Sequence, residues 1–195
     1  VIIPIYSGTE TEAFTKAVNS ILNQSLSPEK VIIAVDGPIN DTLYKRVQDY
    51  KNIPIVNVIE SEKNIGLGAI LKLVLKSVKT ELIARMDSDD VSEQNRLEIQ
   101  YKYFLENNLD ILGSYITESS SSGKKYIRSV PLTKRDILKV SEFRSPFNHV
   151  SVLMRRTVLT ELENYEDCLY AEDWYLWLRL LKRHPELRVA NLPVP

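Results

Sequence analysis

Val1-Ile2-Ile3-Pro4-Ile5 begins the sequence as a continuous apolar run with the length of a strand. Residues 11–24 follow, and their apolar side chains recur at the spacing of one helical face. The same order then repeats, with strands expected at 31–35, 53–59 and 82–86 and helices at 41–50 and 67–78. Strands that are apolar on both faces need a cover on each side. The alternation therefore predicts an α/β fold with a mainly parallel central sheet and helices on both faces.

The second half of the chain is less regular but still alternates between strands and helices. We expect strands at 111–117, 126–130, 151–154 and 187–190 and helices at 94–107, 133–143 and 172–181. The serine-rich stretch 118–123 joins two of these strands and is typical of a hairpin loop rather than of an interdomain linker. We therefore predict a single domain over residues 1–195.

Composition narrows the class of function. The 195 residues are 44% hydrophobic and 26% charged, as in globular proteins, and their formal net charge of -1 gives no global basic surface for nucleic acid. The single cysteine excludes an intrachain disulfide and a cysteine-based zinc site. No apolar run approaches the ~18 residues that span a bilayer. Because the chain starts without Met and stops at Pro195 without a polar tail, we expect it to be part of a longer protein.

Arg85-Met86-Asp87-Ser88-Asp89-Asp90 carries the densest charge in the sequence. It puts three carboxylates directly after an expected buried strand, and ligands of parallel sheets bind beyond the carboxyl ends of the strands. Close carboxylates repel one another unless a cation neutralises them, and oxygen ligands favour Mg²⁺ or Mn²⁺ with positions left open for phosphate. The alternative is a purely structural role in capping the next helix, because Asp favours helix N-caps.

Two more strand ends carry polar groups. Asp36 ends a strand in Val35-Asp36-Gly37-Pro38, where its carboxylate can accept hydrogen bonds from a base or a sugar. A plain turn is the alternative, since Asp-Gly is a common turn pair. Asn64-Ile65-Gly66-Leu67-Gly68 opens a helix, and its backbone can approach a ligand closely there.

Glu172-Asp173-Trp174 begins a late helix whose aromatic residues fit either a core or a site. The helix macrodipole favours carboxylates at this end, so a structural and a catalytic role are both open for the acidic pair. His149 lies just before an expected strand and is either a ligand-binding residue or a hydrogen-bonding structural one.

The motifs occur in an order that resembles the family-2 glycosyltransferases, which have the GT-A fold. The ordered set covers nearly the whole chain: Val1-Ile2-Ile3-Pro4-Ile5-Tyr6, Asp36-Gly37, Asn64-Ile65-Gly66-Leu67, Ala84-Arg85-Met86-Asp87-Ser88-Asp89-Asp90 and Ala171-Glu172-Asp173-Trp174-Tyr175-Leu176-Trp177-Leu178-Arg179. The set is most similar to the bacterial branch that builds capsule, exopolysaccharide and O-antigen units. The resemblance implies an inverting transferase that moves a sugar from a nucleotide donor, usually UDP-linked, to a hydroxyl of a saccharide or lipid-linked saccharide with Mn²⁺ or Mg²⁺ as cofactor.

The same resemblance implies roles for individual residues. Nucleotide contacts are expected from Pro4, Tyr6, Asp36, Asn64, Arg85, Asp87 and Ser88. Asp87 and Asp89 match the metal-binding DxD motif, with Asp89 as the direct ligand and Asp87 on the ribose or a metal-bound water. Asp173 matches the catalytic base, and we expect His149, Glu172 and Trp174 on the acceptor side. Residues 1–90 would then form the nucleotide-binding half and 91–195 the acceptor-side half.

Two departures and two alternatives accompany this prediction. Gly37-Pro38 stands where many members have a second carboxylate, and the chain ends before the segment where many relatives place further donor-site residues and a membrane-associating tail. One alternative is a haloacid-dehalogenase-like phosphatase, although its Asp pair normally follows the first strand. The other is a noncatalytic module that binds nucleotide sugars. A transferase of this branch would be cytoplasmic, peripherally associated with the inner face of the membrane, and would bind no nucleic acid.

Overall fold

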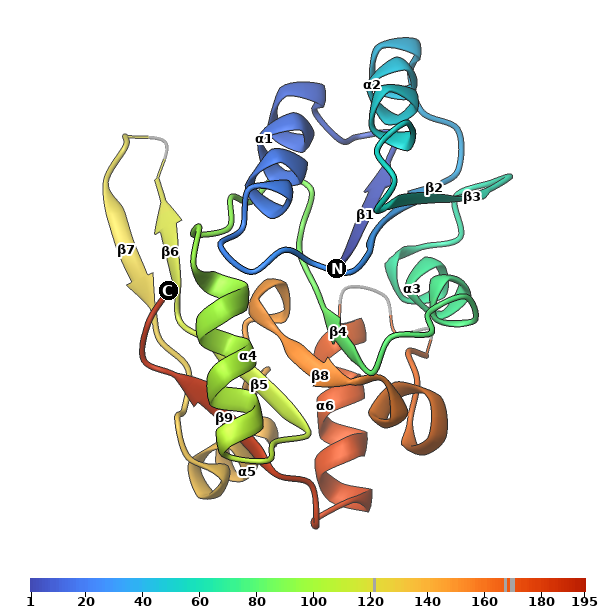
Figure 1. Ribbon diagram of the computed structural model, residues 1–195. Coiled ribbons are helices and arrows are strands. Elements are labelled where there is room, and N and C mark those ends of the chain that lie inside the picture. The colour runs from blue at the N-terminus through green and yellow to red at the C-terminus, as the bar shows by residue number, and fades with distance from the viewer. Residues whose placement is uncertain (121, 167, 169–170) are drawn as a thin grey trace.

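A computed structural model describes residues 1–120, 122–166, 168 and 171–195 of the chain (Figure 1). The first three strands form a parallel sheet in the order β1-β2-β3. They are β1 (Ile2–Tyr6), β2 (Val31–Asp36) and β3 (Val56–Ser61). They alternate along the chain with the helices α1 (Thr11–Leu22), α2 (Asp41–Lys51) and α3 (Leu67–Leu75), as the sequence predicts.

A second sheet, in the order β4-β8-β5-β9, continues the first. Its strands are β4 (Leu82–Ala84), β8 (Leu153–Arg155), β5 (Ile111–Ser114) and β9 (Val189–Leu192). Arg85 forms a parallel bridge with Ile2, and the Met86 N–H donates to the Ile2 carbonyl over 3.1 Å, so β1 and β4 join the two sheets. β8 runs antiparallel to β4 and β5, whereas β5 and β9 are parallel. The predicted mainly parallel α/β fold is confirmed, with β8 as an antiparallel member.

Helices cover both faces of the sheet because successive side chains of a strand point to opposite faces. In β2, Ile33 belongs to the core formed with α1 and α2, while Ile32 belongs to the core on the side of α3. Both side chains are buried, which explains why β2 is apolar from Val31 to Val35. Phe14 of α1 meets Tyr50 of α2 edge to face, with ring centroids 5.7 Å apart, so the two helices form one layer.

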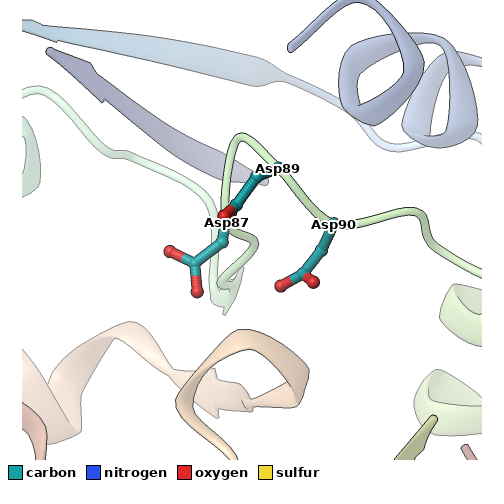
Figure 2. A group of neighbouring side chains, drawn as sticks. All are labelled: Asp87, Asp89 and Asp90. Carbon is teal, nitrogen blue, oxygen red and sulfur yellow. The ribbon is translucent and has the colours of Figure 1, made fainter. Parts of the chain in front are cut away.

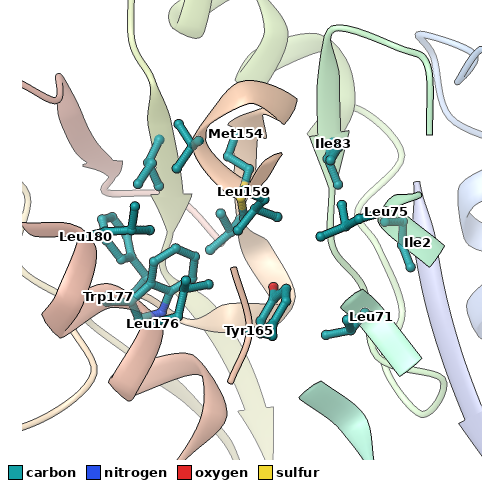
Figure 3. Close-up of a cluster of buried hydrophobic side chains, with 14 of the residues drawn as sticks. Ile2, Leu71, Leu75, Ile83, Met154, Leu159, Tyr165, Leu176, Trp177 and Leu180 are labelled. Carbon is teal, nitrogen blue, oxygen red and sulfur yellow. The ribbon is translucent and has the colours of Figure 1, made fainter. Parts of the chain in front are cut away.

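The larger core lies between the sheet and the helices α3 and α6 (Glu172–Arg183) (Figure 3). Trp177 of α6 is fully buried, and its ring packs edge-on against Phe147 with centroids 5.1 Å apart. Figure 3 shows this side of the core reaching across to Leu71 and Leu75 of α3 and to Ile83 of β4. The core therefore fixes the start of α6 relative to the sheet.

Two further helices complete the layers. α4 (Arg96–Glu106) packs Phe104 against Leu112 of β5, and Val1 contacts both this cluster and the core of α1 and α2, so α4 shares their face. α5 (Lys134–Ser141) lies beside α6. The Thr133 hydroxyl caps α5 by accepting the Asp136 N–H at 3.3 Å.

The single strand expected at 111–117 is wrong. β5 ends at Ser114, and β6 (Ile116–Ser119) begins a separate two-stranded sheet with β7 (Lys125–Arg128). The Ser114 N–H donates to the Ser151 hydroxyl at 2.9 Å, and the Ser114 carbonyl accepts from the Asn148 amide at 2.9 Å. Because these groups take the backbone hydrogen bonds of Ser114, the strand leaves the sheet there. The hairpin expected around the serine-rich loop is confirmed.

Other element boundaries differ by a few residues. β3 starts at Val56 rather than at residue 53, because the Val56 N–H donates back to the Ile53 carbonyl at 2.8 Å in a turn after α2. A 3₁₀ turn at His149–Ser151 and a π-helix at Val158–Leu162 were not predicted. None of the described helices is long and apolar enough to cross a membrane.

β1 and β4 separate beyond their bridge. The backbone of Ile2 faces Met86, so the backbone of Pro4, two residues on, faces the same side, where β4 has already ended. A proline fits inside this central strand because an N–H at Pro4 would find no partner in β4. The carboxyl ends of β1 and β4 thus open apart, which is where ligands bind in open parallel sheets.

Candidate active site

Three carboxylates lie on the short loop that follows β4 (Figure 2). Asp87, Asp89 and Asp90 each offer one oxygen, and these oxygens lie within 4.8 Å of one another. Figure 2 shows the side chains of Asp87 and Asp90 reaching to the same side of the loop. Ser88 is the partly buried residue of the turn between Asp87 and Asp89. Carboxylate oxygens at this spacing fit one hard divalent cation, so the residues present are compatible with Mg²⁺ or Mn²⁺.

Two arginines lie behind this acidic loop. Arg85 is only 2% exposed and pairs with Asp87, while its Nε has no hydrogen-bond partner in the described part of the chain. Arg96 Nη2 donates to the Arg85 carbonyl at 2.9 Å, and burial, followed by the charge of Arg85, lowers the pKa of Arg96 to about 10. Two guanidinium groups thus face three carboxylates, which leaves an excess of negative charge.

The pKa of Asp90 reflects this excess of negative charge. Burial raises the pKa of Asp90, and the charges of Asp87 and Asp89 raise it further, outweighing the opposite effect of Arg85 and Arg96. A carboxylate whose ionised form is disfavoured in the free protein gains most when a cation binds beside it. The sequence assigned the metal to Asp87 and Asp89, and the geometry adds Asp90 as a third candidate ligand.

A cavity of about 1150 Å³ opens beside the acidic loop. The three carboxylates, Tyr126 of the β6–β7 hairpin and Asp173 of α6 all contribute to its walls. Its volume is slightly above the range of ordinary ligand pockets, so it has room for a nucleotide and a sugar together. The fold therefore brings the predicted metal ligands and the predicted base to one cavity.

Asp173 lies in the first turn of α6, where the macrodipole favours its negative charge. Its Oδ2 lies 3.0 Å from the Ser145 hydroxyl, which is also 2.9 Å from the Phe147 carbonyl oxygen. A dipole interaction alone explains an acid at a helix start. It does not explain why this carboxylate lines the same cavity as the acidic loop.

The neighbours of Asp173 on α6 contact other elements. Glu172 packs on the start of α3, with its Cγ 3.3 Å from the position that a Cβ on Gly68 would take. Trp174 Nε1 donates to the Ser141 carbonyl of α5 at 2.7 Å. Neither residue is among the described residues that line the cavity, so their expected contact with an acceptor stays a prediction without geometric support.

His149 lines the cavity, but its ring is engaged within the protein. Its Nε2 lies 2.8 Å from the Tyr165 hydroxyl, and its ring meets Trp177 edge to face with centroids 5.9 Å apart. Burial lowers the pKa of His149 well below its usual value, and the charge of Arg85 lowers it further. Burial likewise raises the pKa of Tyr165. Both rings are therefore neutral near pH 7, which fits the structural alternative for His149.

Asp36 is 5% exposed and acts on the loop before α3. Its two carboxylate oxygens accept the N–H groups of Ile65 at 2.7 Å and Gly66 at 2.9 Å. Gly37 has φ +82°, and a Cβ on it would lie 2.4 Å from the Asn64 nitrogen. Asn64 itself is exposed, and its amide reaches the Asp36 carbonyl at 3.5 Å. Asp36 thus holds this loop, and direct contact with a base stays a prediction.

The other expected nucleotide contacts lie on β1. Pro4 is buried within the strand, whereas Tyr6 at its end is 52% exposed and covers Gly8, where a Cβ would lie 2.6 Å from the ring. The Thr9 hydroxyl accepts the Tyr6 N–H at 3.1 Å and fixes the turn. Tyr6 is accessible to a ligand, while Pro4 acts on the shape of the strand end.

Three side chains at the site, those of Ser145, Tyr165 and Arg96, were not predicted. Ser145 and Tyr165 lie in irregular segments, outside any motif or period, so a single sequence holds no signal for them. Arg96 begins a helix that was predicted, but nothing in the sequence shows that its side chain turns back to Arg85.

Comparison with known proteins assigns the family. Residues 1–163 match the model of the family described as glycosyl transferase family 2. The amylovoran biosynthesis glycosyltransferase AmsE of Erwinia amylovora is 31% identical over 99% of this chain and 72% of its own length. A UDP-Gal:alpha-D-GlcNAc-diphosphoundecaprenol beta-1,3-galactosyltransferase of Escherichia coli is 32% identical over 93% of this chain and 66% of its own length. The chain thus spans about two thirds of the length of this second relative.

Solved structures share the fold. The structure of S. aureus TarS in complex with UDP-GlcNAc has a TM-score of 0.75 at 22% identity and covers 98% of this chain and 54% of that protein. The mannosyltransferase PcManGT from Pyrobaculum calidifontis, in complex with GDP-Man and Mn²⁺, has a TM-score of 0.72 at 15% identity and covers 98% of this chain and 53% of that protein. The expected GT-A fold is confirmed, and the phosphatase alternative is wrong. The chain belongs to glycosyl transferase family 2.

Proposed function

We propose that this chain is the catalytic domain of an inverting glycosyltransferase that moves a sugar from a UDP-sugar to an acceptor hydroxyl in bacterial surface polysaccharide synthesis. The observation that carries the proposal is the shared cavity of about 1150 Å³, lined by Asp87, Asp89, Asp90 and Asp173. Transfer of a sugar from a nucleotide diphosphate needs a cation site and a base within reach of one substrate, and these four carboxylates supply both.

Each residue has a distinct task in this proposal. Asp87, Asp89 and Asp90 hold Mn²⁺ or Mg²⁺, which supplies positive charge for the leaving diphosphate when bound. Asp173 accepts the proton of the acceptor hydroxyl as its oxygen attacks the anomeric carbon. The new bond from carbon to oxygen forms as the bond to the diphosphate breaks, and the electron pair of the broken bond leaves on the diphosphate. Attack from the opposite face inverts the anomeric centre.

Relatives support the choice of donor and acceptor. The Escherichia coli relative is named for UDP-Gal and for a diphosphoundecaprenol-linked GlcNAc acceptor, and TarS was solved with UDP-GlcNAc. From these relatives we infer that this chain uses a UDP-sugar donor and a lipid-linked saccharide acceptor. Such an acceptor would require action at the cytoplasmic face of a membrane, with peripheral association.

The two parts of the chain divide the work in this proposal. Residues 1–90 supply the nucleotide contacts, with Tyr6 open to a ligand and Asp36 fixing the loop at Ile65 and Gly66. Residues 91–195 supply Asp173 and the β6–β7 hairpin on the acceptor side. No nucleic acid partner is part of the proposal.

Asp173→Asn tests the base. Asn keeps the shape and the capping capacity of Asp but cannot accept a proton, so we expect the transfer rate to fall by ~10²–10⁴ while donor affinity stays nearly unchanged. Transfer is measured with UDP-sugars and a diphosphate-lipid acceptor in the presence of Mn²⁺, with donor hydrolysis as a second assay.

Glu172→Gln is the matched control, because Glu172 precedes Asp173 on α6 but packs on α3. Full turnover in a folded Asp173→Asn protein, combined with loss in Glu172→Gln, would pass the role to Glu172. Tight binding of UDP-sugar and Mn²⁺ without transfer or hydrolysis by the unaltered protein would instead favour the noncatalytic module.

A further inference from the structure

Ser145 lies in the loop between α5 and the turn at His149, and the proposed mechanism does not use it. Its hydroxyl is 3.0 Å from Oδ2 of Asp173 and 2.9 Å from the carbonyl oxygen of Phe147. A serine hydroxyl has one proton and two lone pairs, so it can donate to only one of these oxygens at a time. Among the described residues, Ser145 is the side chain that donates a hydrogen bond to the Asp173 carboxylate.

The protonation state of Asp173 decides where the Ser145 proton points. With Asp173 ionised, Ser145 donates to the carboxylate, because a hydrogen bond to a charged acceptor is roughly twice as strong as a neutral one. Once Oδ2 of Asp173 carries the proton from the acceptor hydroxyl, this O–H can donate to Ser145 Oγ, and the Ser145 proton turns to the Phe147 carbonyl. This exchange needs only a rotation about the Cβ–Oγ bond of Ser145.

The two acceptors belong to one rigid unit. Phe147 is 1% exposed, and its ring packs edge-on against Trp177, which lies one helical turn after Asp173 on α6. The carbonyl and the carboxylate are therefore held at a fixed spacing around the Ser145 hydroxyl. Among the other described groups, Tyr165 is close enough for its ionisation to be affected by the charge of Asp173, but its hydroxyl pairs with His149.

We propose that Ser145 is a positioning residue for the general base, which orients the ionised Asp173 carboxylate and stays hydrogen-bonded to it after the proton has arrived. The inference rests on the proposed role of Asp173 in the transferase. No proton is gained or lost by Ser145 over the cycle: the acceptor proton moves to Asp173, and Ser145 only changes the oxygen to which it donates.

The test compares Ser145→Ala, Ser145→Thr and the double variant Ser145→Ala/Asp173→Asn in the transfer assay described above. Ser77→Ala is the control, because the Ser77 hydroxyl also donates to a backbone carbonyl, that of Val74 at 2.8 Å, but at the end of α3 and without a carboxylate. We expect kcat of Ser145→Ala to fall by about 10-fold or more, the equivalent of one charge-assisted hydrogen bond, with KM for the donor unchanged.

The double variant separates positioning from general stability. If Ser145 acts through Asp173, its removal has no further effect on the residual rate of Asp173→Asn, and Ser145→Thr, which keeps the hydroxyl, restores the rate. A full additional loss in the double variant, a rate for Ser145→Thr as low as for Ser145→Ala, or a Ser145→Ala rate equal to that of Ser77→Ala would overturn the inference. Full activity in Asp173→Asn alone would instead remove the proposed base, so the two failures are distinguishable.

Discussion

Asp110 and the acidic loop after β4 lie at opposite ends of the strands of the sheet, and the surroundings of their carboxylates differ. Asp110, at the amino end of β5, accepts the backbone N–H of Arg188 at 2.8 Å and the guanidinium of Arg188 at 3.1 and 3.0 Å. The Nε of Arg155 in β8 lies 3.3 Å from Oδ1 of Asp110. Burial alone would raise the pKa of Asp110, but the hydrogen bonds and charges of the two arginines lower it below its ordinary value.

The acidic loop after β4 has the opposite balance. The pKa of Asp90 is raised, first by burial and then by Asp87 and Asp89, because the two arginines nearby do not offset all three carboxylates. Asp110 completes its hydrogen bonds within the chain and stabilises the fold. The acidic loop is left with an excess of negative charge that a bound cation would neutralise, which is typical of a ligand site.

Asp110→Ala removes the carboxylate that pairs with Arg188 and Arg155. The substitution leaves the backbone N–H and the guanidinium of Arg188 without their carboxylate, while Arg155 keeps its ion pair with Glu81, so we expect the free energy of unfolding to fall by ~1.5–3 kcal/mol. Chemical denaturation with urea measures this loss. Binding of Mn²⁺ and UDP should not change, because Asp110 lies at the amino end of β5, opposite the carboxyl end of the strands where the acidic loop lies.

The pH dependence of that loss follows from the lowered pKa of Asp110. A carboxyl group with a lowered pKa in the folded state contributes stability above its unfolded pKa and loses it as the pH falls through the folded pKa. The difference between the parent chain and Asp110→Ala should therefore be full at pH 7 and shrink below about pH 4. An equal difference at pH 7 and at pH 2 would contradict the assigned ion pairs.

Asp36→Asn tests another carboxylate whose oxygens, like those of Asp110, accept hydrogen bonds from within the chain. The amide has one carbonyl oxygen, so either the Ile65 or the Gly66 N–H loses its acceptor. We expect a loss of stability of about 1 kcal/mol and greater hydrogen exchange at residues 64–66. Weaker UDP binding without either change would show instead that Asp36 acts on the base directly.

Asp90→Asn is expected to raise the stability of the protein, whereas Asp110→Ala is expected to lower it. Because the pKa of Asp90 is raised in the folded protein, its ionisation costs stability as the pH rises above the ordinary carboxyl range. Removing the charge should stabilise the metal-free protein at pH 7 by about 0.5 kcal/mol, a small value because the Asp90 side chain is only partly buried and solvent screens its charge. The gain should vanish near pH 3, and a destabilised variant at pH 7 would show that Asp90 has a structural partner.

The sequence predicts the fold better than it predicts the site. The apolar run of β2 and the helical spacing of α1 determine their burial, because each needs only its own period to find a core. The strand break at Ser114 depends on Asn148 and Ser151, which are distant in the sequence, and no local pattern reports such contacts. The predicted fold class is therefore confirmed, whereas the predicted end of the strand at residue 117 is wrong.

At the site, too, features with a local sequence pattern could be predicted, whereas contacts between distant segments could not. Asp87, Asp89 and Asp173 could be proposed from motifs, because each motif keeps its residues within a few positions. The hydroxyl of Ser145 on Asp173, and the use of both Asp36 oxygens by the backbone, depend on how separate loops meet. These contacts decide how a carboxylate acts, and they are visible only in three dimensions.

Calorimetry of UDP binding with and without Mn²⁺ tests the central claim most directly, namely that the acidic loop is a cation site for a nucleotide donor. Parent chain, Asp89→Ala and Asp110→Ala are compared at pH 7. We predict Mn²⁺-dependent UDP binding in the parent chain and in Asp110→Ala. In Asp89→Ala we predict a loss of about 100-fold or more, since even outer contacts of a metal site cost 10–100-fold. Asp89 is exposed, so that variant should keep the stability of the parent chain. Equally tight, Mn²⁺-dependent UDP binding by a folded Asp89→Ala protein would contradict the account.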